Sequence, residues 1–471
     1  MSEELELTTA ETEQEEVTSQ LLETLLQNKD YRKVKQLLNN LKSQDTAALL
    51  EELPDKDMTI AFRLLTKEDA AETFVEMSSD RQELLLTVFS DAELKAVFDE
   101  MFLDDTVDII EEMPANVVKR IIAQSDAETR KQINEILKYP KDSAGTIMTV
   151  EYVSLREHWT VQKCFEHIRQ TALDKETIYN CYVTDDKRKL LGTVTVKDLL
   201  LNKYETTVAE IMEQDVISVE TTDDKEFVAQ QISKYDLSAI PVTDGENRMV
   251  GIITVDDVLD VVEQEATEDI SIMAAVTPSE EAYLNQSVWQ IWKNRIPWLL
   301  VLMISATFTG LIINKFEERL NSLSVLLFAC IPMLMDTGGN AGGQASVTII
   351  RGLALNDIRP RDIGKVIWKE MRVAFMLASC VAAVCFGKLM LIDGLLFGYP
   401  YTWDICLVVS LALFATVVIA KFVGCVMPIL AKLCRLDPAV VASPFITTIV
   451  DILSLLIFCG IAMTVMPAIT A

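Results

Sequence analysis

The sequence predicts a multidomain membrane protein: an all-α helical superhelix, two tandem α/β domains, a connecting helix and a membrane domain of five helices. Three observations predict this fold class. Apolar residues recur at helical spacing early in the chain, a small strand-rich unit occurs twice, and five long apolar segments follow. The 471 residues are also too many for one hydrophobic core. The expected boundaries are 1–18 for an acidic tail, 19–138 for the superhelix, 139–202 and 203–262 for the α/β domains, 263–293 for the connecting helix and 294–471 for the membrane domain.

Charge is distributed very unevenly along the chain. The formal net charge is −29, yet residues 294–471 hold 10 acidic and 13 basic residues, which leaves 61 acidic and 29 basic residues in 1–293. So acidic a half repels nucleic acid and attracts cations, divalent cations above all. A merely solubilising surface is the alternative explanation. The polar residues 1–18 are expected to be a disordered tail without a cleavable signal.

Cysteine and histidine usage argues against several classes of site. Nine cysteines occur without a CxxC pair, so neither a disulfide framework nor a thiolate metal site is predicted. The two histidines, His158 and His167, are too few for a zinc site or a histidine-rich metal transporter. The sequence shows no P-loop and no nucleophile–base pair, so an enzyme is not expected.

Residues 19–138 are expected to be helical throughout. A short motif recurs within them, spaced by 24, 24 and 12 residues, and its copies begin at Glu52, Glu76, Glu100 and Glu112. Paired helices stacked into a small superhelix would produce such a repeat.

Residues 140–262 contain one strand-and-helix pattern twice, about 59 residues apart. Each copy closes with Thr-x-x-Asp, as Thr195–Asp198 and Thr254–Asp257. The pattern resembles a pair of CBS domains, a family in which this stretch can hold the ribose and phosphates of a nucleotide. The resemblance implies ATP as a ligand of Thr195, Asp198, Thr254 and Asp257, and a purely structural pair is the alternative. A carboxylate suits ribose hydroxyls, as it does in dinucleotide-binding folds.

Five apolar segments approach the length that crosses about 30 Å of hydrocarbon. They lie at 296–313, 323–350, 364–391, 403–430 and 440–468. Basic residues gather between Arg351 and Arg372, whereas the next loop carries only Asp393 and Asp404. The positive-inside rule therefore places the amino-terminal half in the cytosol and, after five spans, the carboxyl terminus outside. The acidic helix at 263–293 is long enough to carry a displacement to the membrane, and a plain linker is the alternative.

Polar residues inside the apolar segments are candidates for function because they are costly there. Asp451 lies well inside the fifth segment, with Thr447 one turn before it on the same helical face. In a two-fold dimer, one carboxylate per chain gives a pair that matches one divalent cation. A buried structural aspartate is the alternative. The second segment contains Asp336-Thr337-Gly338-Gly339-Asn340-Ala341-Gly342-Gly343-Gln344. Its glycines would either allow close helix packing or line a pore, and Asn340 is expected to line the pore.

These motifs resemble the MgtE magnesium channels over nearly the whole chain from about residue 20. The resemblance rests on Pro332-Met333-Leu334-Met335…Gly-Asn-x-Gly-x-Gln in the second segment and on the stretch from Asp437-Pro438-Ala439 through Ser443-Pro444-Phe445 to Asp451. It implies that Asp451 is the main ion ligand, through water, that Thr447 contributes a backbone carbonyl, and that Asn340 and Asp437 belong to the metal sites. Ala442-Ser443-Pro444 departs from the Ser-Gly-Pro common in the family. Magnesium keeps several waters, which agrees with a pore that has few carboxylates.

The resemblance also implies a magnesium sensor in the acidic half. Its carboxylates would repel one another without the ion and close the domains, and with them the pore, when the ion binds; a solvated surface is the alternative for each residue. The implied residues are Asp104, Asp108, Asp224, Glu226, Asp236, Asp257, Asp260, Glu265, Glu268 and Asp269.

The function predicted on these grounds is a homodimeric magnesium channel of the bacterial cytoplasmic membrane. It would import Mg²⁺, close at high cytosolic Mg²⁺ and respond to ATP, with membrane lipid around it. A cation exchanger and a non-conducting nucleotide sensor are the alternatives.

Overall fold

The computed structural model describes residues 19–279, 283–284, 286–355, 357–441 and 443–470. The predicted acidic tail, 1–18, lies outside the described residues. The chain forms two compact units, Met1–Glu263 and Gln264–Ala471, and each is described by itself.

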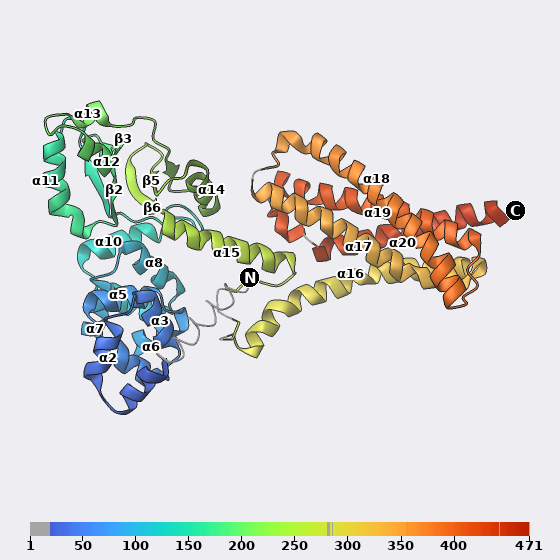
Figure 1. The fold of residues 1–471 in the computed structure, drawn as a ribbon, viewed down its shortest axis with the longest axis horizontal. Coiled ribbons are helices and arrows are strands. Elements are labelled where there is room, and N and C mark those ends of the chain that lie inside the picture. The colour runs from blue at the N-terminus through green and yellow to red at the C-terminus, as the bar shows by residue number, and fades with distance from the viewer. Residues whose placement is uncertain (1–18, 280–282, 285, 356, 442, 471) are drawn as a thin grey trace. The chain divides into compact units, whose positions relative to one another are not determined.

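The first unit begins with a stack of short helices, as the sequence predicts (Figure 1). Each helix packs on the one two positions further along the chain, α3 on α5, α5 on α7 and α7 on α9, which is the arrangement of a superhelix. The helices are α2 (Tyr31–Leu38), α3 (Ser43–Glu51), α4 (Asp55–Phe62), α5 (Lys67–Val75), α6 (Ser79–Val88), α7 (Asp91–Phe98), α8 (Leu103–Glu112), α9 (Ala115–Gln124) and α10 (Ala127–Ile136).

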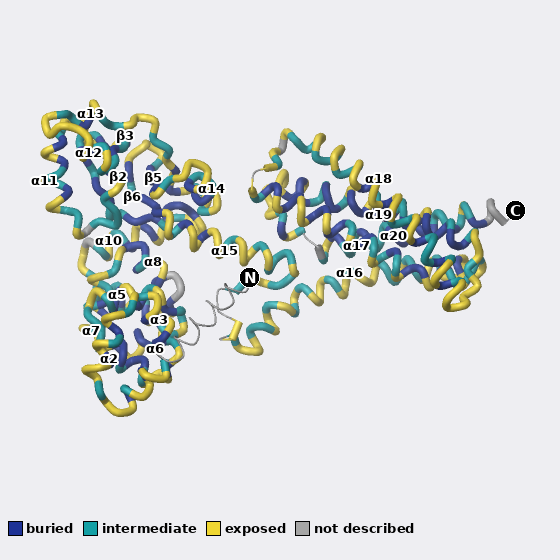
Figure 2. Tube along the Cα trace, viewed as in Figure 1, coloured by how far each residue is buried: buried dark blue, intermediate teal, exposed yellow. Residues whose placement is uncertain are grey.

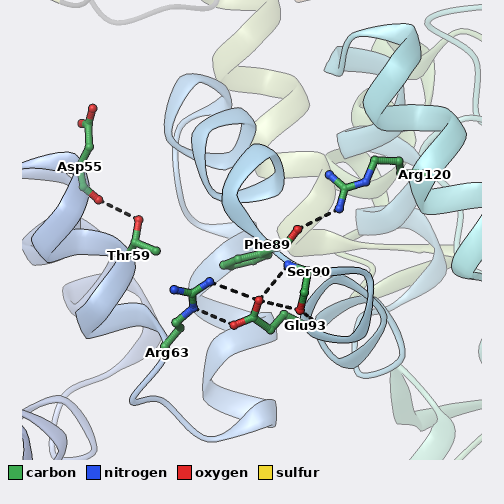
Figure 3. Close-up of polar contacts among 7 residues, drawn as sticks. All are labelled: Asp55, Thr59, Arg63, Phe89, Ser90, Glu93 and Arg120. Carbon is green, nitrogen blue, oxygen red and sulfur yellow. Dashed lines mark hydrogen bonds and ion pairs between the residues drawn. The ribbon is translucent and has the colours of Figure 1, made fainter.

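A polar network joins three turns of this stack (Figure 3). Ser90 and Glu93 form a capping box at the start of α7. The Glu93 carboxylate also accepts from Arg63 of the α4 end, Nε at 2.7 Å and Nη2 at 3.3 Å. Arg120 of α9 donates to the Phe89 carbonyl at 2.9 Å. Side chains thus satisfy backbone groups that the ends of short helices leave without partners.

The tandem α/β domains are confirmed as two three-stranded sheets of the same topology. In each, the first strand pairs parallel to the second and the second antiparallel to the third. The strands, largely buried in Figure 2, are β1 (Tyr152–Leu155), β2 (Thr177–Thr184), β3 (Leu190–Thr195), β4 (Val219–Glu220), β5 (Ala239–Thr243) and β6 (Met249–Thr254). The accompanying helices are α11 (Val161–Thr171), α12 (Val196–Leu201), α13 (Val208–Ile211), α14 (Lys225–Tyr235) and α15 (Val255–Met273).

The superhelix and the second sheet share one hydrophobic core. Buried residues from Leu22 through Ile136 of α10 to Val258 and Val261 of α15 form a single cluster. The first sheet instead has a core of its own, which includes Val153, Leu155 and Val194. Shared burial of this kind fixes the superhelix against α15 within the first unit.

The connecting helix differs from the prediction. The structure places α15 at Val255–Met273, so that it begins inside the second α/β domain, and the next helix begins only at Val288. Ala275 has a positive φ of 55°, in the left-handed conformation that commonly ends a helix. The segment 263–293 therefore holds the second half of α15 and the start of α16, and the described residues between them (274–279, 283–284 and 286–287) are not helical.

In the part of the second unit that the structure describes, five helices are long and apolar enough to cross a membrane, as the sequence predicts. Helix α19 is central, because α17, α18 and α20 all pack on it, and α17 also packs on α20. Their bounds are α16 (Val288–Leu323), α17 (Val325–Ala354), α18 (Ile363–Gly387, continued by the π-helix Lys388–Leu396), α19 (Trp403–Leu433) and α20 (Ser443–Thr470).

Candidate functional site: an ion path in the membrane unit and a carboxylate cluster

The glycines of α17 pack against neighbouring helices. A Cβ added to Gly424 of α19 would lie 2.1 Å from the Gly342 carbonyl oxygen, so the two backbones touch there. On the same side of α17, Gly338 faces Thr416 and Ser454, and Gly339 faces Thr447. The glycines are therefore required for close helix packing, which was one of the two roles considered for them.

Asn340 lies on the other face of α17 and is exposed. Its Nδ2 donates to Asp336 Oδ1 at 3.2 Å, one turn earlier on the helix. Asp451 of α20 is half-buried and lies close enough to Asp336 to interact with it electrostatically. The structure therefore brings two predicted residues, Asn340 and Asp451, to one region and adds Asp336. The four-residue spacing of Asp336 and Asn340 is the sequence signal that could have identified it.

Thr447 and Asp437 have local partners. Thr447 Oγ1 donates to the Pro444 carbonyl at 2.9 Å, in the first turns of α20. Its carbonyl lies one turn from Asp451 inside a continuous helix. Asp437 lies before α20 in an exposed turn, where its Oδ1 accepts from the Ala439 amide at 2.8 Å.

A second group of polar residues lies in the first unit, where α8 and the α/β domains approach each other. We call it the carboxylate cluster. Its members interact electrostatically and come from α5, α8, the first α/β domain and α15: Glu76, Asp104, Asp105, Glu151, Glu176, Asp256, Asp257, Asp260 and Glu263. Asp104, Asp257 and Asp260 were predicted for the sensor, whereas Glu76, Asp105, Glu151, Glu176, Asp256 and Glu263 were not.

Burial and mutual repulsion make this cluster hard to ionise. Burial first, and neighbouring carboxylates second, raise the pKa of Asp105 to about 7 and that of Glu176 to about 7. The same causes raise the pKa of Asp104 well above its ordinary value, and burial raises the pKa of Asp257 and Asp260. The cluster therefore either holds protons or needs a cation.

Two oxygens in the cluster have no hydrogen-bond partner among the residues that the structure describes. They are Asp104 Oδ1 and Glu176 Oε2, both shielded from solvent. A buried acceptor without a donor is costly unless something else satisfies it. A hard cation with oxygen ligands fits this donor set, since the group contains only carboxylates. Within the described residues no three His, Cys, Asp or Glu side chains converge tightly enough to enclose a metal directly.

Other residues predicted for the sensor lie at the ends of α14, on the exposed surface of α8 or further along α15. Asp224 caps α14, its Oδ1 accepting from the Glu226 amide at 2.8 Å, and Asp236 ends that helix with a φ of 52°. Asp108 is exposed on α8. Three more lie on the half of α15 that belongs to the second unit: Glu265, Glu268 and Asp269.

Both Thr-x-x-Asp pairs act as helix caps. The Thr195 amide donates to Asp198 Oδ2 at 3.0 Å, and the Asp198 amide donates to Thr195 Oγ1 at 3.1 Å. These two bonds cap the amino-terminal end of α12. The Thr254 amide donates to Asp257 Oδ2 at 3.3 Å at the start of α15. Each repeat therefore ends its last strand and begins a helix with one motif.

Comparisons with known proteins match every part of this architecture. Family profiles match residues 331–461 (MgtE, divalent cation transporter), 41–142 (MgtE intracellular N domain) and 144–204 with 208–264 (CBS domain). The chain is 36% identical to the magnesium transporter MgtE of Thermus thermophilus, and the aligned region covers 97% of this chain and 100% of that protein. It is 31% identical to the magnesium transporter MgtE of Bacillus subtilis, over 93% of this chain and 95% of that one.

Among solved structures, the cytosolic domain of the Mg²⁺ channel MgtE in complex with ATP is 37% identical to this chain. It covers 52% of this chain and 99% of its own, with a TM-score of 0.50. The soluble part of a magnesium transporter is 31% identical, covering 54% of this chain and 99% of its own, also with a TM-score of 0.50. Because the identity to whole relatives extends through the helical domain, the CBS pair and the membrane helices, the chain belongs to the MgtE family of magnesium transporters.

Proposed function

We propose that the chain is a magnesium channel that imports Mg²⁺ across a bacterial cytoplasmic membrane and closes when Mg²⁺ binds its acidic cytosolic half. The observation that carries the proposal is the presence of two interacting carboxylates inside apolar spans. They are Asp451 of α20 and Asp336 of α17, and Asn340 donates a hydrogen bond to Asp336. Charged and amide side chains in a membrane helix require water, an ion or another polar surface. A two-fold dimer would bring two copies of Asp451 to one axis, with a charge that matches a divalent cation.

The carboxylate cluster supports the gating part of the proposal. Near neutral pH its members repel one another across the contact between α8, the CBS pair and α15. Mg²⁺ bound between them would stabilise the closed contact, and the ion would shift the gate by its differential affinity for the closed form. Asp104, Asp257 and Asp260 belong to this contact. The further carboxylates proposed for the sensor are Asp108, Asp224, Glu226, Asp236, Glu265, Glu268 and Asp269.

ATP is proposed as a modulator, with Thr195, Asp198, Thr254 and Asp257 as its contacts. The support is the ATP-bound relative at 37% identity and the repeated cap, which places polar groups at the start of α15, where phosphates are favoured. Titration of the full-length protein with ATP tests this. Asp198→Ala is expected to weaken binding, and Asp186→Ala, an exposed neighbour on the β2–β3 turn, is its control.

The topology proposed from charge places the amino-terminal half in the cytosol and the carboxyl terminus outside. Basic residues cluster at the α17–α18 junction, including Arg351, Arg361 and Lys365. Import would then follow the membrane potential.

Currents in patches that hold the full-length protein test the function. The wild type is expected to pass Mg²⁺ at low cytosolic Mg²⁺ and to close as cytosolic Mg²⁺ is raised. Asp451→Asn should lose the current or its preference for divalent cations, whereas Asp105→Asn with Glu176→Gln should keep the current and close only at higher Mg²⁺. Flux that requires a sodium or proton gradient would point instead to an exchanger, and a well-folded protein without flux would point to a non-conducting sensor.

A further inference from the structure

A continuous polar stripe runs along the exposed face of α17. Asp336, Asn340, Gln344 and Thr348 follow one another at four-residue intervals, and all four are exposed in this chain. The opposite face carries the buried glycines that touch α19 and α20. Helical geometry stacks residues four apart above one another, so the stripe extends over about three turns, or about 18 Å. Lipid does not solvate such a surface, and it must face water, an ion or protein.

Asp336 is the charged residue of this stripe, and two observations relate it to Asp451. The two carboxylates interact electrostatically, although they lie on different helices. Gly339, three residues after Asp336, packs against Thr447, so α17 and α20 cross at this level. Within the described part of the membrane unit, the ion pairs join Lys365 to Asp362, Lys388 to Asp393 and Lys421 to Glu370, and none neutralises either carboxylate.

We infer that Asp336 is a second carboxylate of the ion path and helps it to prefer divalent over monovalent cations. This inference rests on the proposed function. The Asn340 amide donates to Asp336 Oδ1 and orients the carboxylate along the stripe. Two carboxylates per chain at one level attract a doubly charged ion twice as strongly as a singly charged one at the same distance. Because Mg²⁺ retains its waters, Asp336 acts on the hydrated ion, and Gln344 and Thr348 accept or donate hydrogen bonds to those waters further along.

The experiment measures Mg²⁺ uptake into proteoliposomes and currents with mixed Mg²⁺ and K⁺, using the full-length protein. Asp336→Asn keeps the size of the side chain and removes its charge, and Asp336→Glu keeps the charge. The matched control is Asp404→Asn, which removes a carboxylate in the first turn of α19, a different helix from that of the stripe. Asp336→Asn is expected to raise the half-saturating Mg²⁺ concentration about tenfold and to lower selectivity for Mg²⁺ over K⁺, whereas Asp336→Glu keeps most of both.

Charge restoration separates a local electrostatic effect from a folding defect. In Asp336→Cys, a negatively charged thiol reagent is expected to recover divalent selectivity and a positively charged reagent to abolish flux. The same reagents on the wild type measure the background from native cysteines such as Cys380 and Cys434, which are exposed.

Three outcomes decide the matter. Weakened selectivity in Asp336→Asn, together with recovery by the negative reagent, supports the inference. Normal Mg²⁺ flux in the wild type with Asp336→Asn indistinguishable from Asp404→Asn overturns this inference alone, because the proposed channel still stands. Absence of Mg²⁺ flux in the well-folded wild type overturns the proposed function and this inference with it.

Discussion

Two acidic residues of the superhelix have pKa values shifted in opposite directions, because their surroundings differ. Glu93 and Asp105 are both acidic residues in the first turns of superhelix helices. Hydrogen bonds from Ser90 first, and from Arg63 second, lower the pKa of Glu93 to about 2. Burial among other carboxylates instead raises the pKa of Asp105 to about 7. Glu93 therefore stabilises the fold as an anion, whereas ionisation of Asp105 costs free energy in the folded state and becomes easier when a cation binds nearby.

Glu93→Gln is expected to lower the free energy of unfolding by about 1 kcal/mol at neutral pH, a value kept modest because the side chain is 38% exposed. The folded pKa is depressed, so this stability is present above the ordinary value of 4.5 and disappears as pH falls toward about 2. Denaturant unfolding from pH 7 to pH 3 measures it. The control is Glu83→Gln on the exposed side of α6. An equal loss at pH 7 and pH 3 would contradict the explanation.

Gly424→Ala tests the backbone contact between α17 and α19. The added methyl would meet the Gly342 carbonyl at 2.1 Å, so the helices must separate, which is expected to cost about 2–3 kcal/mol and to lower the melting temperature in detergent. Gly460→Ala is the control because nothing lies within 4 Å of its added methyl. It should be neutral or slightly stabilising, since alanine favours a helix. Equal melting temperatures of the two variants would rule out the close contact.

At the scale of helices, the membrane unit is held by packing and, among its described residues, by a buried ion pair. Lys421 of α19 lies 3.4 Å from Glu370 of α18, with the two side chains 6% and 16% exposed. The pair links α18 and α19 and so favours one relative position of the two helices. A buried charge without its partner is far more costly than an apolar residue in its place.

Lys421→Met is therefore expected to destabilise the membrane unit by about 3–5 kcal/mol, because it leaves Glu370 without its cation. The double variant with Glu370→Met should recover most of the loss. Thermal unfolding of the full chain in detergent measures both. The control is Lys365→Met, which breaks a pair whose lysine is 87% exposed and should change stability by less than about 1 kcal/mol. A double variant no more stable than Lys421→Met would show that the charges act separately.

At the scale of the whole molecule, the raised pKa values of the carboxylate cluster couple folding to protons, and the proposed sensor role adds a divalent cation to this coupling. Asp105 and Glu176 bind more protons in the folded state than in the unfolded state between their ordinary and folded pKa values. Stability of the first unit must therefore fall as pH rises through about 7 when Mg²⁺ is absent. An ion that binds the folded cluster reverses this loss by mass action.

The measurable result is a melting temperature of the first unit that falls between pH 6 and pH 8 in Mg²⁺-free buffer. Added Mg²⁺ should restore it at pH 8 and change it little at pH 6. Asp105→Asn should flatten both dependences, while Asp186→Asn, an exposed residue outside the cluster, should leave them as in the wild type. A stabilisation by Mg²⁺ of equal size at both pH values would place the bound ion elsewhere.

The sequence alone determined the architecture of this protein because its signals are local. Five apolar segments, the repeated Thr-x-x-Asp pattern and the helical spacing of residues 19–138 each depend on neighbours within a few turns. Asp451 could be selected in the same way, since a carboxylate in an apolar segment is costly whatever surrounds it. The sequence predicts the connecting helix at 263–293, whereas α15 extends over Val255–Met273. Its ends depend on the cap at Thr254 and the turn at Ala275, which helical periodicity does not show.

Only the tertiary structure decided which residues share a site. Glu176 and Asp105 are far apart in sequence, and nothing in either segment shows that both are buried against Asp257. The same holds for Asp336, whose relation to Asp451 follows from the crossing of α17 and α20 at Gly339 and Thr447. Periodicity indicates which face of an element is apolar, but electrostatic energy depends on distances between elements, and these are fixed by packing.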